Sequence, residues 1–314
     1  MAARQLLAPR PAVRTALLVL VTIALGVLSA CQDSSADRGA TPSTPAPSTP
    51  SSPASTPTAS PASVTPRFAR YVALGDSYTA APGVPGATSN DGCLRSSGNY
   101  PHLLAASLPV RRLVDVSCGG ADTDDVRRPQ LRGVSPQLDA VTADADLVTI
   151  GLGGNDAQLF GRLLATCLRQ EAATTSGTPC ADSLGPSVPA ALTRIETNLT
   201  GVVRDVRRKA PDAKILLVGY PQIIPATGRC AEVPFAPGDY RFARRVNQGL
   251  TEAVERAATA TRTTYVDLWA ASKGHDVCSA DPWINGLSGP GAAPFHPFAA
   301  EQAEVARLVA AALG

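Results

Sequence analysis

The chain has 314 residues, a formal net charge of +2 and seven cysteines. Its charged residues make up 17% and nearly balance in sign, which excludes the basic footprint of a nucleic-acid-binding protein, so we expect no nucleic-acid partner. The length suits one large domain or two average ones. The odd number of cysteines leaves one thiol unpaired if the others form disulfides.

An export signal is predicted at the N-terminus. Residues 1–30 hold three arginines and no acidic residue, and a mostly apolar stretch runs from Ala16 to Ala30. A basic start followed by a short apolar run that ends in small residues is typical of a signal peptide. The run is shorter than the roughly 20 residues that span a bilayer, which argues against a permanent anchor helix.

The end of this segment, Leu28-Ser29-Ala30-Cys31, resembles a bacterial lipobox. The resemblance implies cleavage before Cys31, a diacylglyceryl thioether on its sulfur and acylation of its amine. Two or more acyl chains hold a protein stably on a membrane. We therefore expect an exported protein anchored through Cys31 to the outer face of a bacterial cell membrane. Loss of the three arginines changes its net charge from +2 to −1.

A tether is predicted between this cysteine and the rest of the chain, over residues 31–66. Positions 40–66 are Ala, Thr, Ser and Pro except for Val64. Such a segment has little apolar surface to bury and cannot offset the entropy of ordering. Frequent proline favours an extended chain with a reach on the order of 100 Å. We interpret it as a spacer, with a passive disordered tail as the alternative.

Residues 67–314 are long enough for one core, and short apolar runs alternate in them with longer amphipathic ones. The predicted strands are Tyr71–Leu74, Leu113–Val116, Leu147–Ile150, Ile215–Val218 and Thr264–Val266. The predicted helices are Tyr100–Leu108, Asp156–Gln170, Val188–Ala210, Asp239–Ala260 and Pro297–Leu313. This alternation predicts an α/β fold of three layers, with a central parallel sheet of about five strands covered on both faces.

Polar and glycine-rich segments follow the first three predicted strands, and a histidine precedes the last helix. They are Gly75-Asp76-Ser77-Tyr78, Ser117-Cys118-Gly119-Gly120-Ala121, Gly151-Leu152-Gly153-Gly154-Asn155-Asp156 and Phe295-His296-Pro297. Active groups of open parallel sheets gather beyond the carboxyl ends of the strands. Each segment has a plain alternative: Ser77 or Asn155 as a helix cap, the glycine pair as a tight turn, His296 as a packing residue. Together they supply a nucleophile, oxyanion donors and a base.

Two other functional motifs are each excluded by one residue. A dinucleotide fingerprint that starts at Gly151 needs glycine at position 156, which is Asp. The elbow of α/β-hydrolases needs glycine at position 79, which is Thr. A loose calcium-binding cluster is suggested by Asp122, Asp124 and Asp125, but we interpret these residues as part of a solvated loop.

The four segments together resemble the SGNH hydrolase superfamily, also called GDSL lipases and esterases, and within it the secreted actinobacterial branch with three disulfides. The resemblance covers residues 67–314 and implies the flavodoxin-like SGNH fold. It implies that Ser77 is the nucleophile and His296 the general base. The N–H groups of Ser77 and Gly120 and the side-chain amide of Asn155 would form the oxyanion hole. No metal or organic cofactor is implied.

The sequence departs from the family pattern at two positions. The first motif ends in Tyr78 rather than Leu, a position to which we assign no chemistry. Ala293 occupies the position where the family has an aspartate that orients the histidine, and some members of the branch use a backbone carbonyl instead. The histidine needs such a partner to hold the right tautomer. We expect a Ser–His dyad with the carbonyl of Ala293, or else of Pro294, as that partner. Asp267 and Asp281 are the alternatives.

Six cysteines remain once Cys31 is lipidated, and an exported protein keeps them oxidised. Six cysteines allow fifteen pairings. The resemblance implies Cys93–Cys118, Cys167–Cys180 and Cys230–Cys278. His102 and His275 are weaker candidates for the base than His296.

The predicted function is a serine esterase or lipase that hydrolyses lipid or other acyl esters at the cell envelope. The alternatives are a carbohydrate O-deacetylase of the same fold and a non-enzymatic, envelope-binding lipoprotein. We expect a monomer. The acyl chain length and the physiological substrate do not follow from the sequence.

Overall fold

The structure is a computed structural model that describes residues 67–171 and 176–314. The predicted export signal, Cys31 and the tether lie outside the described residues. Within them, no helix combines the length and the apolar character that a membrane crossing requires.

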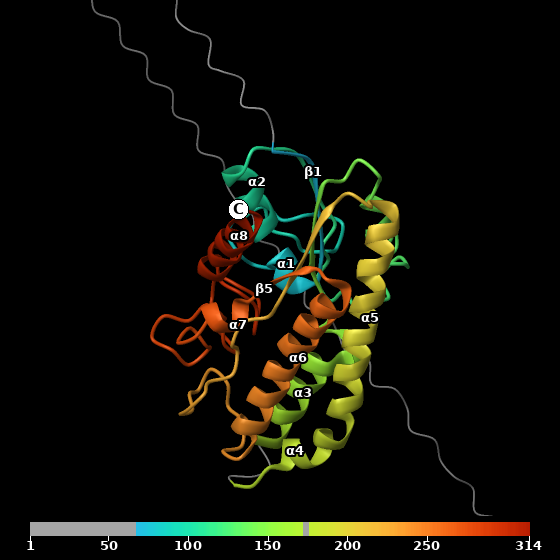
Figure 1. Ribbon diagram of the computed structural model, residues 1–314. Helices are drawn as coiled ribbons and strands as arrows, with labels where there is room; N and C mark the ends of the chain where they lie inside the picture. The colour runs from blue at the N-terminus through green and yellow to red at the C-terminus, as the bar shows by residue number, and fades with distance from the viewer. Residues whose placement is uncertain (1–66, 172–175) are drawn as a thin grey trace, which may run out of the picture. The chain divides into compact units, whose positions relative to one another are not determined.

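Five parallel strands form one sheet in the order β2-β1-β3-β4-β5. Of these strands, β1 and β5 are labelled in Figure 1. β1 lies second in the sheet, between β2 and β3, and Gly75 at its end pairs with Gly151 at the end of β3. β3 is buried along its whole length, as expected of a strand covered on both faces. The strands are β1 (Phe68–Gly75), β2 (Val110–Asp115), β3 (Leu147–Gly151), β4 (Lys214–Val218) and β5 (Thr264–Val266).

Helices cover the two faces of the sheet as separate layers. The helices are α1 (Ser77–Ala80), α2 (Tyr100–Ser107), α3 (Leu159–Glu171), α4 (Pro179–Leu184), α5 (Val188–Lys209), α6 (Asp239–Thr261), α7 (Leu268–Ala271) and α8 (Ala299–Leu313). Alternate residues of β1 face opposite layers: Val72 and Leu74 pack toward α5 and α6, whereas Tyr71 and Ala73 pack toward α2 and α8. The predicted three-layer α/β/α fold with a five-stranded parallel sheet is therefore confirmed.

All five predicted strands and all five predicted helices are present; the bounds of β5 match the prediction, and the other elements differ from it at one or both ends. β2 begins at Val110, three residues before the predicted start. The prediction missed this start because two exposed arginines follow Val110 on this edge strand. Those charges hide the start of the strand from a search for apolar runs, and charged side chains are common on strands at a sheet edge. The short helices α1, α4 and α7 were not predicted.

The three disulfides join Cys93 to Cys118, Cys167 to Cys180 and Cys230 to Cys278, as predicted. The first ties the loop after α1 to the loop after β2. The second ties α3 to α4. Disulfides of this kind are typical of exported proteins, because an oxidising environment maintains them.

Both ends of the domain meet at the edge of the sheet where the strands begin. The guanidinium of Arg67 donates hydrogen bonds to the carbonyl oxygens of Leu313 and Gly314. Arg67 directly precedes β1, so the chain enters the domain beside its own C-terminus. This edge lies opposite the edge where the strands end.

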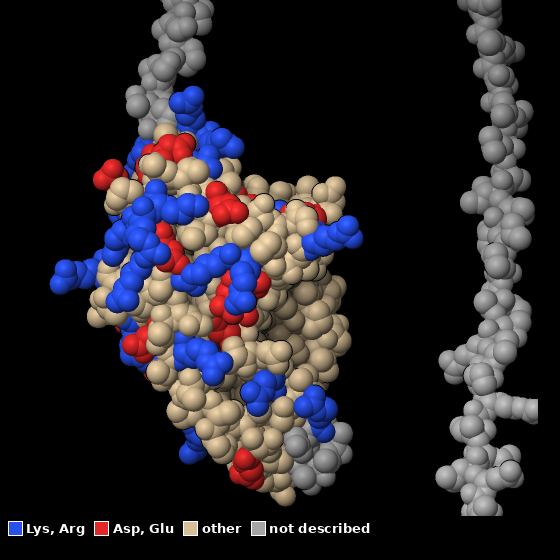
Figure 2. Space-filling model, turned by 90° about the vertical axis from the view of Figure 1, so that its right-hand side faces the viewer, with Lys and Arg blue, Asp and Glu red and all other residues tan. Residues whose placement is uncertain are grey.

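Lys and Arg side chains gather on the face that α5 covers, with Asp and Glu among them (Figure 2). Asp205 on α5 forms ion pairs with Arg127 and Arg208, and Glu196 pairs with Arg256 at 2.7 Å. The mixture of signs indicates a solvated surface rather than a polyanion-binding stripe.

Candidate active site

The turn after β1 presents Ser77 at the carboxyl edge of the sheet. Asp76 caps α1 by accepting a 2.8 Å hydrogen bond from the N–H of Tyr78, which leaves Ser77 as the first helical residue. The turn is tight: a Cβ on Gly75 would lie 2.1 Å from Oγ1 of Thr79. Glycine at position 75 therefore allows the strand to pass directly into the helix that carries the serine.

Three hydrogen-bond donors surround the position of Ser77. The backbone N–H groups of Ser77 and Gly120 have no acceptor within the described residues. Gly120 has φ of +80°, a conformation that favours glycine. Nδ2 of Asn155 donates one hydrogen to the carbonyl oxygen of Ala121 at 2.9 Å, which leaves its second hydrogen free. These are the three donors predicted for an oxyanion hole.

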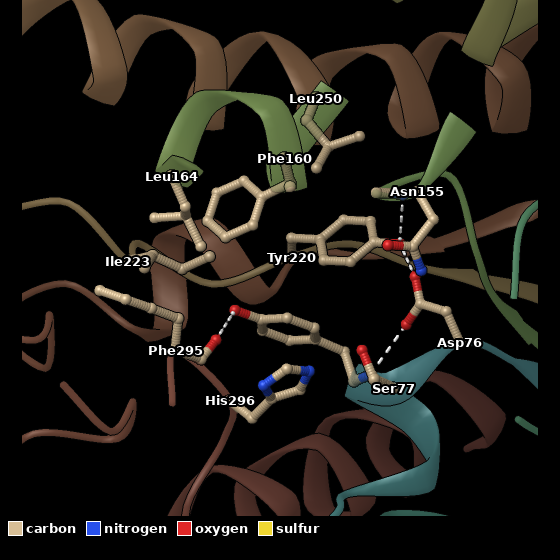
Figure 3. Close-up of a pocket in the computed structure, with 13 residues that line it drawn as sticks. Asp76, Ser77, Asn155, Phe160, Leu164, Tyr220, Ile223, Leu250, Phe295 and His296 are labelled. Atoms are coloured by element: carbon tan, nitrogen blue, oxygen red, sulfur yellow. Dashed lines mark hydrogen bonds between the residues drawn. The ribbon is translucent and has the colours of Figure 1, made fainter. Parts of the chain in front are cut away.

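His296 lies beside Ser77 in the segment that leads into α8 (Figure 3). Its Nδ1 atom is 2.7 Å from the carbonyl oxygen of Pro294. A carbonyl only accepts, so Nδ1 carries the hydrogen and Nε2 keeps a free lone pair. Burial lowers the pKa of His296 below 6.5, and the carbonyl of Pro294 opposes the shift. The imidazole is therefore neutral at pH 7, as a general base must be.

The carbonyl that contacts Nδ1 belongs to Pro294, which corrects the first-named prediction of Ala293. The carbonyl of Ala293 instead accepts the backbone N–H of His296 at 3.1 Å, closing a tight turn. Because that turn uses the Ala293 oxygen, the next carbonyl along the chain faces the ring. Sequence spacing names both residues but does not distinguish them.

The alternative acids and histidines have other partners. Asp267 caps α7 through the N–H of Ala270 at 3.0 Å, and Oδ2 of Asp281 lies 3.5 Å from Nδ1 of His275. His275 also stacks on Trp283, with 4.2 Å between the ring centroids. Nδ1 of His102 lies 2.7 Å from Oδ1 of its helix cap Asn99. His296 is thus the histidine that the fold brings to Ser77. The structure records no hydrogen bond between their side chains, and such bonds often tighten only with substrate.

Tyr220 connects the turn after β1 with the turn after β3. It was not identified from the sequence. Its hydroxyl accepts a hydrogen bond from the N–H of Gly154 at 2.8 Å and donates one to Oδ2 of Asp76. Burial raises the pKa of Asp76 to about 7. Tyr220 lies just beyond the end of β4, so the rule that active groups gather at strand ends could have found it.

Gln137 is a second residue that the sequence did not reveal. Its side-chain oxygen accepts from the N–H of Gly75 at 2.9 Å, and its nitrogen donates to the carbonyl of Gly75 at 2.9 Å. Gln137 is therefore a buried support of the residue where β1 ends. No local pattern marks it, since its partner lies 62 positions away.

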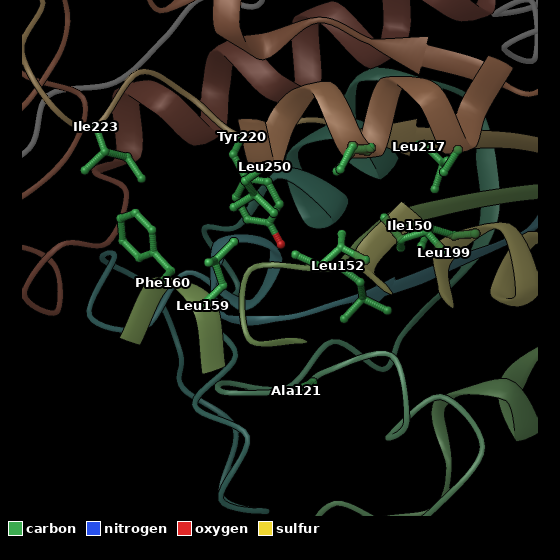
Figure 4. Close-up of a cluster of buried hydrophobic side chains, with 14 of the residues drawn as sticks. Ala121, Ile150, Leu152, Leu159, Phe160, Leu199, Leu217, Tyr220, Ile223 and Leu250 are labelled. Atoms are coloured by element: carbon green, nitrogen blue, oxygen red, sulfur yellow. The ribbon is translucent and has the colours of Figure 1, made fainter. Parts of the chain in front are cut away.

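An apolar cavity of about 120 Å³ opens beside Ser77, Asn155 and His296. Phe160 and Leu164 of α3 line it together with Tyr220, Ile223 and Leu250 (Figure 3). Phe160, Tyr220, Ile223 and Leu250 also belong to the main hydrophobic core, part of which is shown in Figure 4. Because the cavity begins at the serine, it fits the apolar part of a bound molecule.

Similar proteins identify the family of this chain. A family model described as the GDSL-like Lipase/Acylhydrolase family matches residues 73–302. The chain belongs to this family. It is 41% identical over 256 residues to Lipase 2 of Streptomyces coelicolor, covering 78% of this chain and 85% of that relative.

Two solved structures of Streptomyces enzymes share the fold. The extracellular lipase of Streptomyces rimosus superposes with a TM-score of 0.68 and is 28% identical, with 78% of this chain and 99% of that chain covered. Phospholipase A1 of Streptomyces albidoflavus NA297 gives a TM-score of 0.65 and is 29% identical, with the same coverage. The chain is thus a lipase or esterase of the GDSL family, and its predicted class as a carboxylic ester hydrolase is confirmed.

Asp122, Asp124 and Asp125 form hydrogen bonds and an ion pair within their own loop. Oδ1 of Asp122 accepts from the N–H groups of Asp124 and Asp125, and Asp124 pairs with Arg128 at 2.5 Å. Across the described ranges, 67–171 and 176–314, no group of three or more His, Cys, Asp or Glu side chains is arranged to hold a metal ion.

Proposed function

We propose that this GDSL-family member hydrolyses carboxylic acyl esters through a Ser77–His296 dyad and an acyl-enzyme. The observation that carries the proposal is the pairing of His296 with the carbonyl of Pro294 beside Ser77. A backbone carbonyl can orient the imidazole as the aspartate of a triad does. The reaction then needs no third side chain.

In the first half-reaction, Nε2 of His296 takes the proton of the Ser77 hydroxyl while Oγ attacks the ester carbonyl carbon. The carbonyl oxygen becomes an oxyanion and receives hydrogen bonds from the N–H groups of Ser77 and Gly120 and from Nδ2 of Asn155. The C–O bond to the alcohol breaks, and the imidazolium returns the proton to the departing oxygen. Water activated by His296 then releases the acid and restores Ser77.

The cavity favours an acyl group with a longer hydrocarbon chain over an acetyl group. Its walls are side chains of Phe, Leu and Ile, which gain free energy by removing hydrocarbon from water. An acetyl group would leave most of this surface unfilled. The apolar lining therefore supports a lipase or esterase and weakens the alternative of a carbohydrate deacetylase.

The test is turnover of p-nitrophenyl esters from acetyl to palmitoyl by the purified protein. We expect Ser77→Ala to abolish turnover and Asn155→Ala to lower kcat on the order of 10²–10³-fold, as loss of an oxyanion donor does. Ser107→Ala on α2, remote from the site, is the matched control and should behave like the native protein. A fluorophosphonate should label the native protein but not Ser77→Ala.

Full activity of Ser77→Ala would refute the mechanism. Absence of both turnover and labelling in the native protein would favour the non-enzymatic binding protein. A preference for acetyl esters would favour the deacetylase.

We also propose that Cys31 carries the lipid that holds the enzyme on the outer face of the cell membrane. The lipobox-like segment and the three disulfides support export to that side. In a bacterial host, Cys31→Ala should move the enzyme from the membrane fraction to the medium. Mass spectrometry of the native N-terminal peptide should show an acylated cysteine, and an unmodified Cys31 would contradict the anchor.

A further inference from the structure

α3 separates two hollows with opposite character. Phe160 and Leu164, four residues apart, face the apolar cavity beside Ser77. Arg162, Thr166 and Arg169 lie on another face of the same helix and line a groove of about 740 Å³. Spacings of three, four and seven residues place these three side chains in one stripe. The helix is therefore a partition with one apolar side and one cationic side.

The two hollows share Gly161 and Asn155. Gly161 has helical backbone geometry, and a Cβ built on it would meet nothing within 4 Å. Packing therefore does not require glycine at position 161, although glycine weakens a helix interior relative to alanine. What the glycine provides is a low rim between the cavity and the groove, next to Asn155.

The charge of the groove is locally positive. Arg162 and Arg169 line it, and neither forms an ion pair with any described residue. Among the described residues that line it, Asp122 is the single carboxylate, and its Oδ1 already accepts two backbone hydrogen bonds. The domain from position 67 onward has equal numbers of basic and acidic residues, so this excess belongs to the groove rather than to the whole protein.

We propose that the groove is a second subsite, which binds an anionic group on the polar part of an ester whose acyl chain fills the apolar cavity. The polar part crosses the rim at Gly161, and the two arginines bind its phosphate or carboxylate. This inference rests on the proposed function. It names the substrate class as amphiphilic acyl esters with an anionic group close to the ester.

The groove suits such a group better than it suits a longer acyl chain. Hydrocarbon laid along the groove would strip water from Arg162 and Arg169 without giving them a partner, which is unfavourable. An oxyanion replaces that water with charge-assisted hydrogen bonds, and guanidinium groups match the geometry of phosphate and carboxylate. Gln158, Thr166 and Ser183 add neutral polar groups to the lining.

The experiment compares two soluble esters that differ only in the anionic group, 1-octanoylglycerol and 1-octanoylglycerol 3-phosphate. The native protein should have the higher kcat/KM for the phosphate ester. Arg162→Gln and Arg169→Gln together should lower that kcat/KM about tenfold or more and leave the neutral ester within about twofold, because only one substrate loses charge-assisted bonds. Arg194→Gln on α5, another exposed and unpaired arginine, is the control and should change neither.

A second variant tests the rim. Gly161→Leu raises it and should lower kcat/KM for the phosphate ester more than for p-nitrophenyl butyrate. Added salt, from about 50 mM to about 500 mM, should reduce the preference for the phosphate ester, since it screens exposed charges.

The outcomes separate this inference from the function on which it rests. If the native protein hydrolyses both esters and the arginine variants leave their kcat/KM ratio unchanged, the subsite is refuted while the esterase stands. If neither ester is hydrolysed, the proposed function itself fails.

Discussion

The hydroxyl of Tyr78 donates a 2.7 Å hydrogen bond to the carbonyl oxygen of Phe295. Tyr78 follows the proposed nucleophile and Phe295 precedes the proposed base, although 217 positions separate them. Phe295 has φ of +58°, a left-handed conformation that is uncommon for a bulky residue. The ring of Tyr78 also packs against the ring of His296, with 5.7 Å between centroids. The residue that replaces leucine in the GDSL motif thus supports the turn that carries His296.

Tyr78→Phe should lower kcat about tenfold with little change in KM, because loss of one hydrogen bond loosens the base without removing a substrate contact. Tyr78→Leu, which also removes the ring packing, should lose more. Steady-state kinetics with p-nitrophenyl butyrate measure both. Tyr265→Phe, which removes a hydroxyl bonded to Thr251 at 2.9 Å, is the control. A native kcat in Tyr78→Phe would show that the hydroxyl does not position His296.

The activity should have an acid limb whose midpoint lies below pH 6.5. Burial lowers the pKa of His296, and the imidazolium cannot take the proton of Ser77, so kcat/KM rises as pH rises through that pKa. A pH profile of kcat/KM measures the midpoint. Asp76→Asn removes the nearby carboxyl whose pKa burial raises to about 7. An unchanged midpoint in that variant assigns the limb to His296, and a midpoint above 6.5 would contradict the direction of the shift.

Glu301 should make the fold less stable as pH rises. Its side chain on α8 is buried with Nε2 of Gln302 as its hydrogen-bond donor at 2.6 Å, and burial raises its pKa from 4.5 to about 8. The unfolded chain loses this proton above 4.5, whereas the native state keeps it to about 8. The free energy of unfolding therefore falls across that window.

Glu301→Gln should flatten this fall and raise Tm near pH 8 by several degrees, with a smaller difference near pH 5. Thermal unfolding at the two pH values measures it. Asp76 keeps part of the slope, since burial raises its pKa as well. Glu304→Gln, on the same helix and paired with Arg307, is the control. An equal Tm for Glu301→Gln and the native protein near pH 8 would contradict an ionisation cost at Glu301.

Loss of the Cys93–Cys118 disulfide should reduce activity before it unfolds the domain. The carbonyl of Cys93 accepts the N–H of Gly119 at 2.8 Å, directly before the donor glycine Gly120. The double variant Cys93→Ala, Cys118→Ala should therefore lose kcat at temperatures where circular dichroism still shows the native fold. The double variant Cys230→Ala, Cys278→Ala should lower Tm with a smaller loss of kcat. Equal kcat in both would refute a special role for the first disulfide.

The sequence predicts the sheet and its carboxyl edge well, because parallel strands are buried on both faces and their ends are marked by glycine and polar residues. Ser77, Gly120 and Asn155 each follow a strand within a few positions, so local patterns find them. No strand leads to His296, and the sequence points to it through its place just before the last helix and through the family resemblance.

The supports of the site escape sequence reasoning for a physical reason. Tyr220 and Gln137 act through hydrogen bonds to Asp76, Gly154 and Gly75, which are distant in the chain. The identity of the carbonyl that holds His296 depends on one turn, where a shift of one residue exchanges Ala293 for Pro294. Only the three-dimensional structure fixes such pairings.

The hydrogen bond between Arg67 and Gly314 places both ends of the domain at one corner, which determines where another molecule can be attached to it. β1 runs from that corner to Gly75 over eight residues, a span of roughly 25 Å, so Ser77 lies at the far end of the strand from both Arg67 and Gly314. A fusion partner or a solid support attached directly before Arg67 or after Gly314 is therefore held at the end of the domain remote from Ser77 and the apolar cavity.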